Sequence, residues 1–472
     1  MAGGAEGGMR AILAAVLCLL IGVGPVWATE AGLPAADLST VRVLDLHTAQ
    51  AVALAANPNM AAARARVEQA RARVEQAAAA WWPSLDLSSG GSRQRLAESG
   101  TQFDPAMAAL LAGSTDRTLE VYTAGLQATW VLFDGFYRRF KRLQAEYDEQ
   151  SAAAGLADSR RLLISGVAEA FLNAQLAQTN TDIYRADETF YLRQLEDAEN
   201  RYNVGAGPWG DILNIKVQLN AARTGLLRSQ REFEAAGYGL AALMGLVEAR
   251  LPEGVRLQKQ DQGADPPASA EDVDTLIQEA RAVRPDIRRL ETLVLGAEAA
   301  SGMAKAPFYP RVQAVGAVEG AREGDPGLSD ENFGNTLGVQ LAWNLYAGGA
   351  DRARLTEARQ ARREAVATLA GLRNEVAGEI RRDLALLASA AEQVRLQRET
   401  VALVEENREL AQNEYEAGES PLIRLNEAQR DLVATYGRLA LALAARDLAA
   451  QRLLAATGRN LAGFDAPAGE RP

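Results

Sequence analysis

An internal duplication constrains this sequence more than any other feature. The segment Gly125–Trp130 returns as Gly338–Trp343 and Tyr202–Gly205 returns as Tyr415–Gly418, both at an offset of 213 residues, whereas Asn57-Pro58 returns as Arg284-Pro285 at an offset of 227. A repeated period indicates a repeated supersecondary unit. The interval of 115 residues from each repeated Trp to a later Gly (Gly245, Gly458) is unchanged. A rigid element is therefore predicted there, and a loop absorbs the difference of 14 residues.

The first 28 residues have the pattern of an export signal. Arg10 precedes the apolar run Ala11–Val23, and Val26–Ala28 ends in a small residue suited to cleavage. The run is shorter than the ~20 residues that span a bilayer, so we predict a cleaved signal peptide, 1–28, with translation starting at Met1 or Met9. Cys18 is the only cysteine. The mature chain therefore lacks disulfides and depends on packing or assembly for stability.

Composition argues against several kinds of function. The net charge is −11 and no basic cluster stands out along the sequence, which argues against a nucleic-acid partner. No glycine pattern suited to phosphate binding occurs, so no nucleotide cofactor is expected. His47 is the only histidine, and we expect it to pack in the structure rather than bind a metal. With no catalytic constellation, the chain is not expected to be an enzyme.

Long helices follow each repeated strand segment. No proline occurs between Gly135 and Pro208, and apolar residues recur at helical spacing. A helix over about 136–202 would be roughly 100 Å long. The returning helix, about 211–243, adds roughly 50 Å and the opening helix, about 58–81, roughly 36 Å. We therefore expect the two shorter helices to lie end to end beside the long one, with Asp211 and Ser420 beginning the returning helices.

Between the opening and long helices the apolar period changes to two. Tyr122, Leu126 and Trp130 then share one face, and the second repeat places Val339, Leu341 and Trp343 on the equivalent face. About ten alternating residues with a terminal aromatic are typical of outer-membrane strands. A soluble antiparallel sheet with one buried face is the alternative. We predict that these six residues face outer-membrane lipid.

Four strands per chain imply assembly. A closed barrel needs about eight or more strands, and an open edge is not tolerated in lipid. A homotrimer with twelve strands is therefore expected, with an eight-stranded dimer as the alternative. The predicted fold class is mainly α with a membrane β part, the twelve strands forming a barrel that an α-helical barrel continues.

The predicted organisation follows the duplication. The first repeat covers 29–245, with a short helix, strands at about 83–95 and 119–133, and a helical hairpin, 136–245. A linker, 246–275, joins it to the second repeat, 276–460, which has a helix, strands at about 310–320 and 335–346, and a hairpin, 350–458. A short tail, 461–472, follows.

On these motifs the chain resembles the TolC family of outer-membrane efflux and secretion channels. The resemblance covers about 42–460 and rests on Asn57-Pro58, Trp82–Leu85, Leu132–Gly135 and Tyr202–Gly205. It implies a trimeric exit duct in the outer membrane of a Gram-negative bacterium, extending into the periplasm. It also implies a periplasmic adaptor and an inner-membrane RND or ABC transporter as partners, in a tripartite efflux or type I secretion system.

The resemblance assigns roles to the two hairpin turns. Adaptor docking is implied for Val204, Gly205, Ala206, Gly207, Ala417, Gly418, Glu419 and Ser420. A gate is implied for Asp211, Arg424 and Glu427. The family often has acidic residues at the last two positions, so Arg424 suggests an ion-pair latch with Glu427 instead. The alternatives are that both glycines at the turns are helix C-caps and that Arg424 and Glu427 are an ordinary surface pair.

Two other functions fit long helical hairpins. A periplasmic adaptor would carry one hairpin within a small β domain, and a coiled-coil spacer would leave the strands unexplained. Two hairpins with two amphipathic strand pairs favour the duct, and its cargo is not apparent from the sequence.

Overall fold

The computed structural model describes residues 42–95, 118–252, 254–260 and 272–464. All of them belong to one compact unit, Ala36–Pro472. The predicted signal peptide, 1–28, lies outside the described residues, as do 96–117 between the first two strands, 253 and 261–271 of the linker, and 465–472 of the tail.

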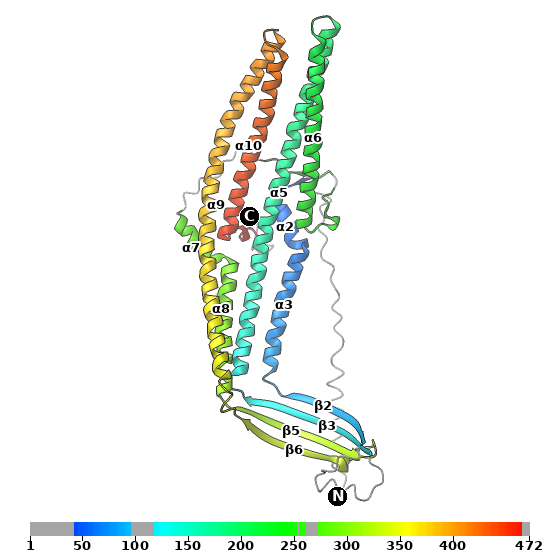
Figure 1. The fold of residues 1–472 in the computed structure, drawn as a ribbon, viewed down its shortest axis with the longest axis vertical. Coiled ribbons are helices and arrows are strands. Elements are labelled where there is room, and N and C mark those ends of the chain that lie inside the picture. The colour runs from blue at the N-terminus through cyan, green and yellow to red at the C-terminus, as the bar shows by residue number, and fades with distance from the viewer. Residues whose placement is uncertain (1–41, 96–117, 253, 261–271, 465–472) are drawn as a thin grey trace. The chain divides into compact units, whose positions relative to one another are not determined.

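The two repeats contain the same elements in the same order (Figure 1). The first comprises α2 (Leu46–Ala56), α3 (Pro58–Ala79), β2 (Ser84–Arg95), β3 (Thr118–Phe133), α5 (Tyr137–Asn203) and α6 (Trp209–Leu243). The second comprises α7 (Val273–Val283), α8 (Pro285–Met303), β5 (Arg311–Glu323), β6 (Phe333–Ala342), α9 (Ala350–Glu416) and α10 (Leu422–Thr457). The long helices α5 and α9 have 67 residues each. The predicted mixture of long helices and a β part is confirmed.

Each long helix is flanked by two shorter ones. Helix α5 packs against α6 along the half near the hairpin turn and against α3 along the other half (Figure 1). Helix α9 packs in the same way against α10 and α8. The end-to-end arrangement expected from the helix lengths is therefore observed. Contacts of α5 with α8 and α10 join the two repeats.

The residue before each repeated proline fastens the opening helix to the end of the returning helix. Asn57 Oδ1 accepts a hydrogen bond from the Asn59 N–H at 2.8 Å and caps α3, while its Nδ2 donates to the Leu243 carbonyl at 2.7 Å. In the second repeat, Arg284 Nη1 donates to the Ala456 carbonyl at 2.8 Å. Different side chains thus bind the equivalent carbonyl in each repeat, which explains why both motifs recur together.

The four strands form one antiparallel sheet in the order β2-β3-β5-β6. Its register places Leu126 opposite Leu87 on one side and Val318 on the other. Strand β6 ends at Ala342, opposite Arg311, so Trp343 follows the strand instead of lying within the predicted 335–346. The physical reason is that Pro310, which precedes β5, has no N–H to continue the ladder.

Strand β4 (Arg256–Leu257) of the linker pairs in parallel with β1 (Val43–Leu44), which precedes α2, and a 3-10 turn, η1 (Val247–Ala249), lies between α6 and β4. An apolar cluster joins this strand pair to α2, α5 and α6. Its buried residues are Leu44, Ala49, Ala53, Val167, Phe171, Ala174, Leu240, Met244 and Leu257. A second cluster packs α7 and α8 against α9 and α10. Both lie beside the joints between opening and returning helices, so the described linker strands stabilise the middle of the helical part.

Candidate functional site

Both hairpins turn through the same helix-ending motif. At the end of α5, Gly205 has a φ of +77° and its N–H donates to the Tyr202 carbonyl at 2.9 Å, while the Ala206 N–H donates to the Arg201 carbonyl at 2.8 Å. The equivalent bonds surround Gly418, whose φ is +79°. This pattern is a C-cap of the Schellman type, for which glycine is preferred because of its left-handed φ. The C-cap interpretation of both glycines is confirmed.

The turns project into solvent. Val204 is 79% exposed, and Ala206, Ala417 and Glu419 are exposed as well, whereas Gly207 and Ser420 are half-buried. A Cβ added to Gly205 or Gly418 would meet no atom within 4 Å. The local fold therefore requires the left-handed backbone at these positions but leaves the space beside them empty.

The returning helices begin at other residues than predicted, α6 earlier, at Trp209, and α10 later, at Leu422. Pro208 and Pro421 are the N-caps of α6 and α10, and neither helix has a side-chain cap. Asp211 and Arg424 are instead equivalent first-turn residues whose N–H groups donate to those prolines' carbonyls. The prediction that Asp211 and Ser420 begin the helices was wrong. The extended backbone of each proline (ψ near 150°) already sets the helix entry without a capping side chain.

Asp211 lies close to the second hairpin. Burial, together with the negative charges of Asp211 and Asp197, raises the pKa of Tyr415 on α9, and the Arg201 cation opposes this shift. The Arg201 guanidinium carbon is 5.2 Å from the centroid of the Tyr415 ring. Arg201 of the first hairpin therefore stacks on Tyr415 of the second beside the turns, the charge of Asp211 acts on the same tyrosine, and a change in hairpin spacing would weaken both interactions.

Arg424 pairs across its own hairpin. Its Nη1 lies 3.5 Å from Glu414 Oε2 at the end of α9. Glu427 is exposed on the same side of α10 as Arg424. Within one chain, the described ion-pair partner of Arg424 is thus Glu414 rather than the predicted Glu427. The three proposed gate residues all lie in the first two turns of the returning helices, next to the exposed tips.

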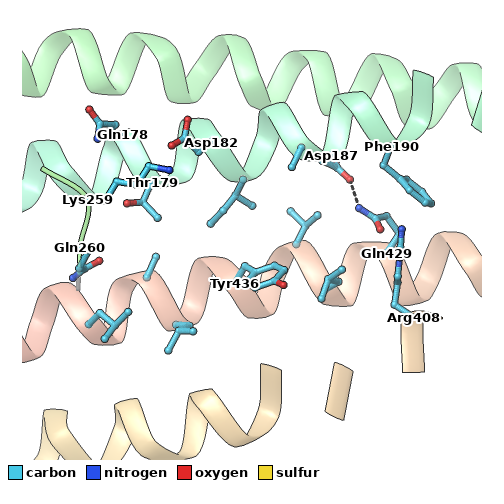
Figure 2. A pocket seen from close by; sticks show the side chains of 17 residues that line it. Gln178, Thr179, Asp182, Asp187, Phe190, Lys259, Gln260, Arg408, Gln429 and Tyr436 are labelled. Carbon is cyan, nitrogen blue, oxygen red and sulfur yellow. Dashed lines mark hydrogen bonds between the residues drawn. The ribbon is translucent and has the colours of Figure 1, made fainter. Parts of the chain in front are cut away.

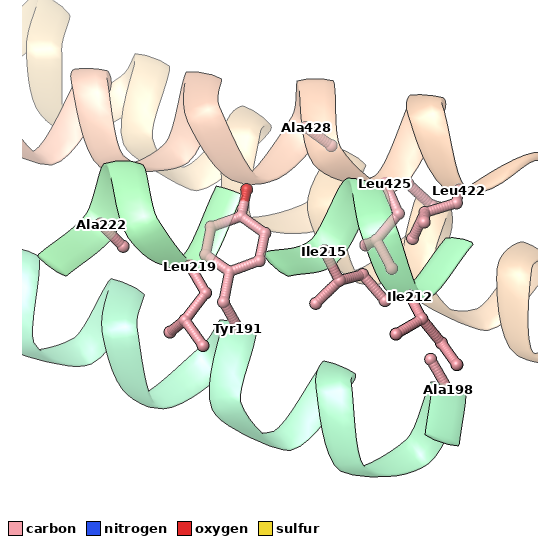
Figure 3. Close-up of a cluster of buried hydrophobic side chains, with 10 residues drawn as sticks. Tyr191, Ala198, Ile212, Ile215, Leu219, Ala222, Leu422, Leu425 and Ala428 are labelled. Atoms are coloured by element: carbon pink, nitrogen blue, oxygen red, sulfur yellow. The ribbon is translucent and has the colours of Figure 1, made fainter. Parts of the chain in front are cut away.

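An apolar cluster joins the two hairpins behind the tips (Figure 3). Its buried residues come from α5, α6, α9 and α10: Tyr191, Ala198, Ile212, Ile215, Leu219, Ala222, Ala411, Leu422, Leu425 and Ala428. Burying several large aliphatic side chains stabilises such a contact by roughly 1.5–3 kcal/mol each. This apolar cluster therefore holds the two hairpins firmly together just behind the tips.

One turn further from the tips, the contact between the hairpins becomes polar (Figure 2). Asp187 Oδ1 accepts a hydrogen bond from Gln429 Nε2 at 2.8 Å, and burial raises the pKa of Asp187. Both residues line a cavity of about 510 Å³ between α5, α10 and the linker. The Tyr191 hydroxyl and Gln429 Oε1 are buried without a hydrogen-bond partner among the described residues. Because such groups are costly, the hairpins are joined less firmly here than at the apolar cluster.

The residues predicted to face lipid share one face of the sheet. The register pairs Trp130 and Val339 with Ala314, and Leu341 with Val312, while Tyr122 lies on the same face four residues from Leu126. Val339 and Leu341 are 70% and 64% exposed. Trp343, just beyond β6, is 53% exposed. An apolar sheet face that the chain itself leaves uncovered needs an apolar environment.

No group of three or more His, Cys, Asp or Glu residues in the described ranges could hold a metal ion. His47 stacks on Phe464 with ring centroids 4.8 Å apart, which agrees with the packing role expected for it. No helix in the described ranges has both the length and the apolar character required to cross a membrane.

Comparison with known sequences identifies the family. The sequence model named "Outer membrane efflux protein" matches residues 51–246 and 276–459, which include both repeats. The chain belongs to the outer membrane efflux protein family. The resemblance drawn from the repeated motifs is confirmed, and with it the outer-membrane location.

Individual relatives of this outer membrane efflux protein are distant. Nodulation protein T of Rhizobium leguminosarum bv. trifolii is 24% identical over 335 residues, 69% of each chain. Cation efflux system protein CusC of Escherichia coli K12 is 25% identical, covering 69% of this chain and 70% of that one. The solvent efflux pump outer membrane protein SrpC of Pseudomonas putida is 25% identical over 407 residues, covering 85% and 81%.

Solved structures agree on the fold. A crystal structure of CusC matches with a TM-score of 0.72 at 20% identity, covering 89% of this chain and 94% of that one. The outer membrane protein VceC of Vibrio cholerae matches with a TM-score of 0.69 at 21% identity, covering 88% and 96%. At this identity the likeness concerns the fold alone.

Sequence reasoning missed three residues beside the tips: Arg201, Glu414 and Tyr415. Tyr202 and Tyr415 were visible as repeated positions; Tyr202 packs on Trp209 of its own hairpin, and Tyr415 contacts Arg201 of the other. The polar pair Asp187 and Gln429 gave no signal, because each looks like an ordinary polar residue of a long helix.

Proposed function

We propose that three copies of this chain form an exit duct through the outer membrane, with no chemistry performed on the cargo. One observation carries the proposal: the sheet has an apolar face, and its edge strands β2 and β6 have no further strand partner among the described residues. Unpaired edges are not tolerated in lipid, so other copies must supply partners. Three copies supply the twelve strands of a closed barrel large enough to hold a channel.

The helices would continue this barrel as a periplasmic tunnel. Its exposed tips at Gly205 and Gly418 would dock a periplasmic adaptor, and an inner-membrane RND or ABC transporter would provide the energy. Relatives named as components of a cation efflux system and of a solvent efflux pump support this assignment. Their cargoes differ, so the names support the duct rather than one cargo.

The gate would lie beside the tips, where Arg201 stacks on Tyr415, the charge of Asp211 acts on that tyrosine, and Arg424 pairs with Glu414. Each pair is partly exposed, so its loss should change the open-to-closed ratio by a factor of up to about five, equivalent to ~1 kcal/mol. Several weak links of this kind hold a tunnel closed yet let a docked partner open it.

The first test combines mass and conductance. We expect detergent-extracted protein to have the mass of three chains and to form pores of low conductance in a planar bilayer. Arg424→Ala or Asp211→Asn should raise the mean conductance up to about fivefold. Arg185→Ala, which removes an exposed pair with Asp182 far from the tips, should leave it unchanged. A monomeric mass would overturn the trimer, and unchanged conductance in both tip variants would exclude the gate.

Docking at the tips is tested by asparagine at the C-cap glycines. Asparagine accepts the left-handed backbone, and no neighbouring atom obstructs it at Gly205 or Gly418. We therefore expect Gly205→Asn/Gly418→Asn to fold and form pores normally, while its side chains block a closely fitting adaptor. Export by cells carrying the variant should fall at least about tenfold, the effect of ~1.4 kcal/mol of lost docking. Normal export would mean that these glycines serve only as caps.

A further inference from the structure

A basic groove lies on the helical wall next to the sheet. Lys305 at the end of α8 and three residues of α9, Arg359, Arg362 and Arg363, line a groove of about 490 Å³. Phe140 of α5 adds an aromatic surface, and the remaining lining is Glu298, Ser301 and Gly302. These eight residues define the basic groove, and no part of the proposed duct mechanism uses it.

The groove carries an excess of positive charge. Glu298 is its one carboxylate, and Glu298 Oε2 lies 3.6 Å from Arg362 Nη2. Within the described part of the chain, Lys305, Arg359 and Arg363 have no carboxylate partner, and Arg363 donates only to the Gln360 amide oxygen at 3.4 Å. A chain with a net charge of −11 thus gathers three uncompensated cations at one place. Such a site attracts an anion.

The basic groove lies on the face of the helical layer that corresponds to the apolar face of the sheet. A separate cavity of about 990 Å³ lies on the polar face of the sheet, beside Thr129 and Arg311, and is lined on α8 by Met303 and Ala304. With 3.6 residues per helical turn, Glu298 and Lys305 point away from those two residues. The basic groove therefore lies on the side of the apolar sheet face, which the proposed barrel turns toward lipid.

The groove is centred on α8, which lies inside the helical layer of the protomer. Helix α8 packs against α5 on one side and α9 on the other, and the groove is lined by all three. In the proposed trimer, neighbouring copies would meet at the edges of the helical layer. The outer face of α8 would therefore stay open.

Lys305 lies near the expected level of the lipid headgroups, and the arginines of α9 lie deeper along the helix and reach toward that level. Lys305 precedes the first residue of β5, Arg311, by six residues, and Arg359 lies nine residues into α9, about 14 Å along the helix. Trp130 and Trp343 lie at this end of the apolar face, as aromatics do at a membrane interface. Headgroups add about 5–7 Å to each side of the hydrocarbon core, and long basic side chains reach back toward it.

We propose that the basic groove binds the phosphate headgroup of an anionic phospholipid in the periplasmic leaflet, and so holds the duct at a set height. Guanidinium groups bind phosphate oxygens through paired, charge-assisted hydrogen bonds, and Phe140 offers an apolar surface to the glycerol and upper acyl chain. The proposal rests on the proposed placement of the sheet in the outer membrane.

The test is lipid binding by the purified full chain in neutral detergent, measured by native mass spectrometry. We expect phosphatidylglycerol to be retained at least about tenfold more tightly than phosphatidylcholine. Lys305→Gln/Arg359→Gln/Arg363→Gln should abolish this preference. The matched control Arg223→Gln/Arg228→Gln/Arg231→Gln, which removes equal charge from α6 far from the strands, should keep it.

Other outcomes overturn the proposal. Equal binding of the two lipids by the unchanged protein would do so, as would a preference that survives the glutamine variant. Displacement of phosphatidylglycerol by inorganic phosphate at about 10 mM would mean a soluble-anion site instead, since free phosphate would already fill the groove. Should the glutamine variant not fold, about 0.5 M salt must remove the preference of the unchanged protein. Pore conductance, measured on the same samples, reports on the duct independently.

Discussion

Replacing Arg284 by methionine is expected to lower the free energy of unfolding by about 3–5 kcal/mol, because it leaves the buried carboxylate of Asp286 without its main cation. Arg284 is 4% exposed, and its Nη2 lies 2.7 Å from Asp286 Oδ2 while its Nη1 lies 2.7 Å from Glu379 Oε2. The same Nη1 donates to the Ala456 carbonyl, so the joint between α8 and α10 is lost too. Only Arg161, at 3.6 Å, would still face Asp286.

The effect should depend on pH in a definite direction. Burial alone would raise the pKa of Asp286, but hydrogen bonds and the positive charges of Arg284 and Arg161 outweigh it and lower the pKa below its usual value. A carboxyl with a lowered pKa stabilises the fold above its unfolded pKa of about 3.9, and this contribution is lost as the pH falls through the folded value. The difference between the native protein and Arg284→Met should therefore be largest near neutrality and shrink below about pH 4.

Denaturant unfolding followed by circular dichroism at neutral and acidic pH measures both quantities. Arg185→Met is the control, since Arg185 and Asp182 form an exposed pair worth at most about 1 kcal/mol. If Arg284→Met were no more destabilising than this control, the buried network would not hold the second joint.

Gly245→Ala is expected to destabilise the fold by about 2–5 kcal/mol. Gly245 has a φ of +72°, and a Cβ there would lie 2.6 Å from the Ala56 carbonyl oxygen and 2.8 Å from the Asn57 Cα. Both are backbone atoms, so no side chain can move aside. The methyl group would push α6 away from the start of α3 and break the bond between Asn57 and Leu243.

Gly205→Ala is the matched control, because Gly205 has a similar φ of +77° but no atom within 4 Å of an added Cβ. Gly205→Ala should lower the free energy of unfolding only by the cost of a left-handed backbone for alanine, about 1–2 kcal/mol. The difference between the two variants measures the close approach at the joint. If denaturant unfolding showed the same loss of unfolding free energy for both variants, the joint would be able to relax, and Gly245 would be needed for its backbone conformation alone.

Much of the fold was predictable because the relevant signals are local. The absence of proline and the helical apolar spacing predicted α5 and α9, and alternation of apolar residues predicted the sheet face that carries Leu126 and Val339. The repeated motifs were recognisable, but their cause was not. Only the structure relates Asn57 to Leu243 and Arg284 to Ala456, since each bond joins residues that are far apart in the chain.

The errors lie where two local rules compete or where a distant neighbour decides. Asp211 and Ser420 fit the usual capping residues, yet Pro208, three residues before Asp211, and Pro421, directly after Ser420, are the N-caps of α6 and α10. An ordinary surface pair of Arg424 with Glu427 is not formed among the described residues of one chain, where Glu414 on α9 is the partner, whereas the proposed latch between copies stays a prediction. Spacing along one helix cannot predict which residue of an adjacent helix will be nearest.

The sequence by itself determined the duplicated plan, the equal length of the two long arms, the amphipathic strands and the family, because these follow from periodicity and from motifs read in order. Only the tertiary structure decided which residues meet. Arg359, Arg362 and Arg363 are close together in the sequence, but Lys305 joins them in one groove only because α8 and α9 pack side by side. Tyr415 meets Arg201 of the other hairpin for the same reason. Contacts between helices depend on packing angle and register, which the pattern within a single helix does not contain.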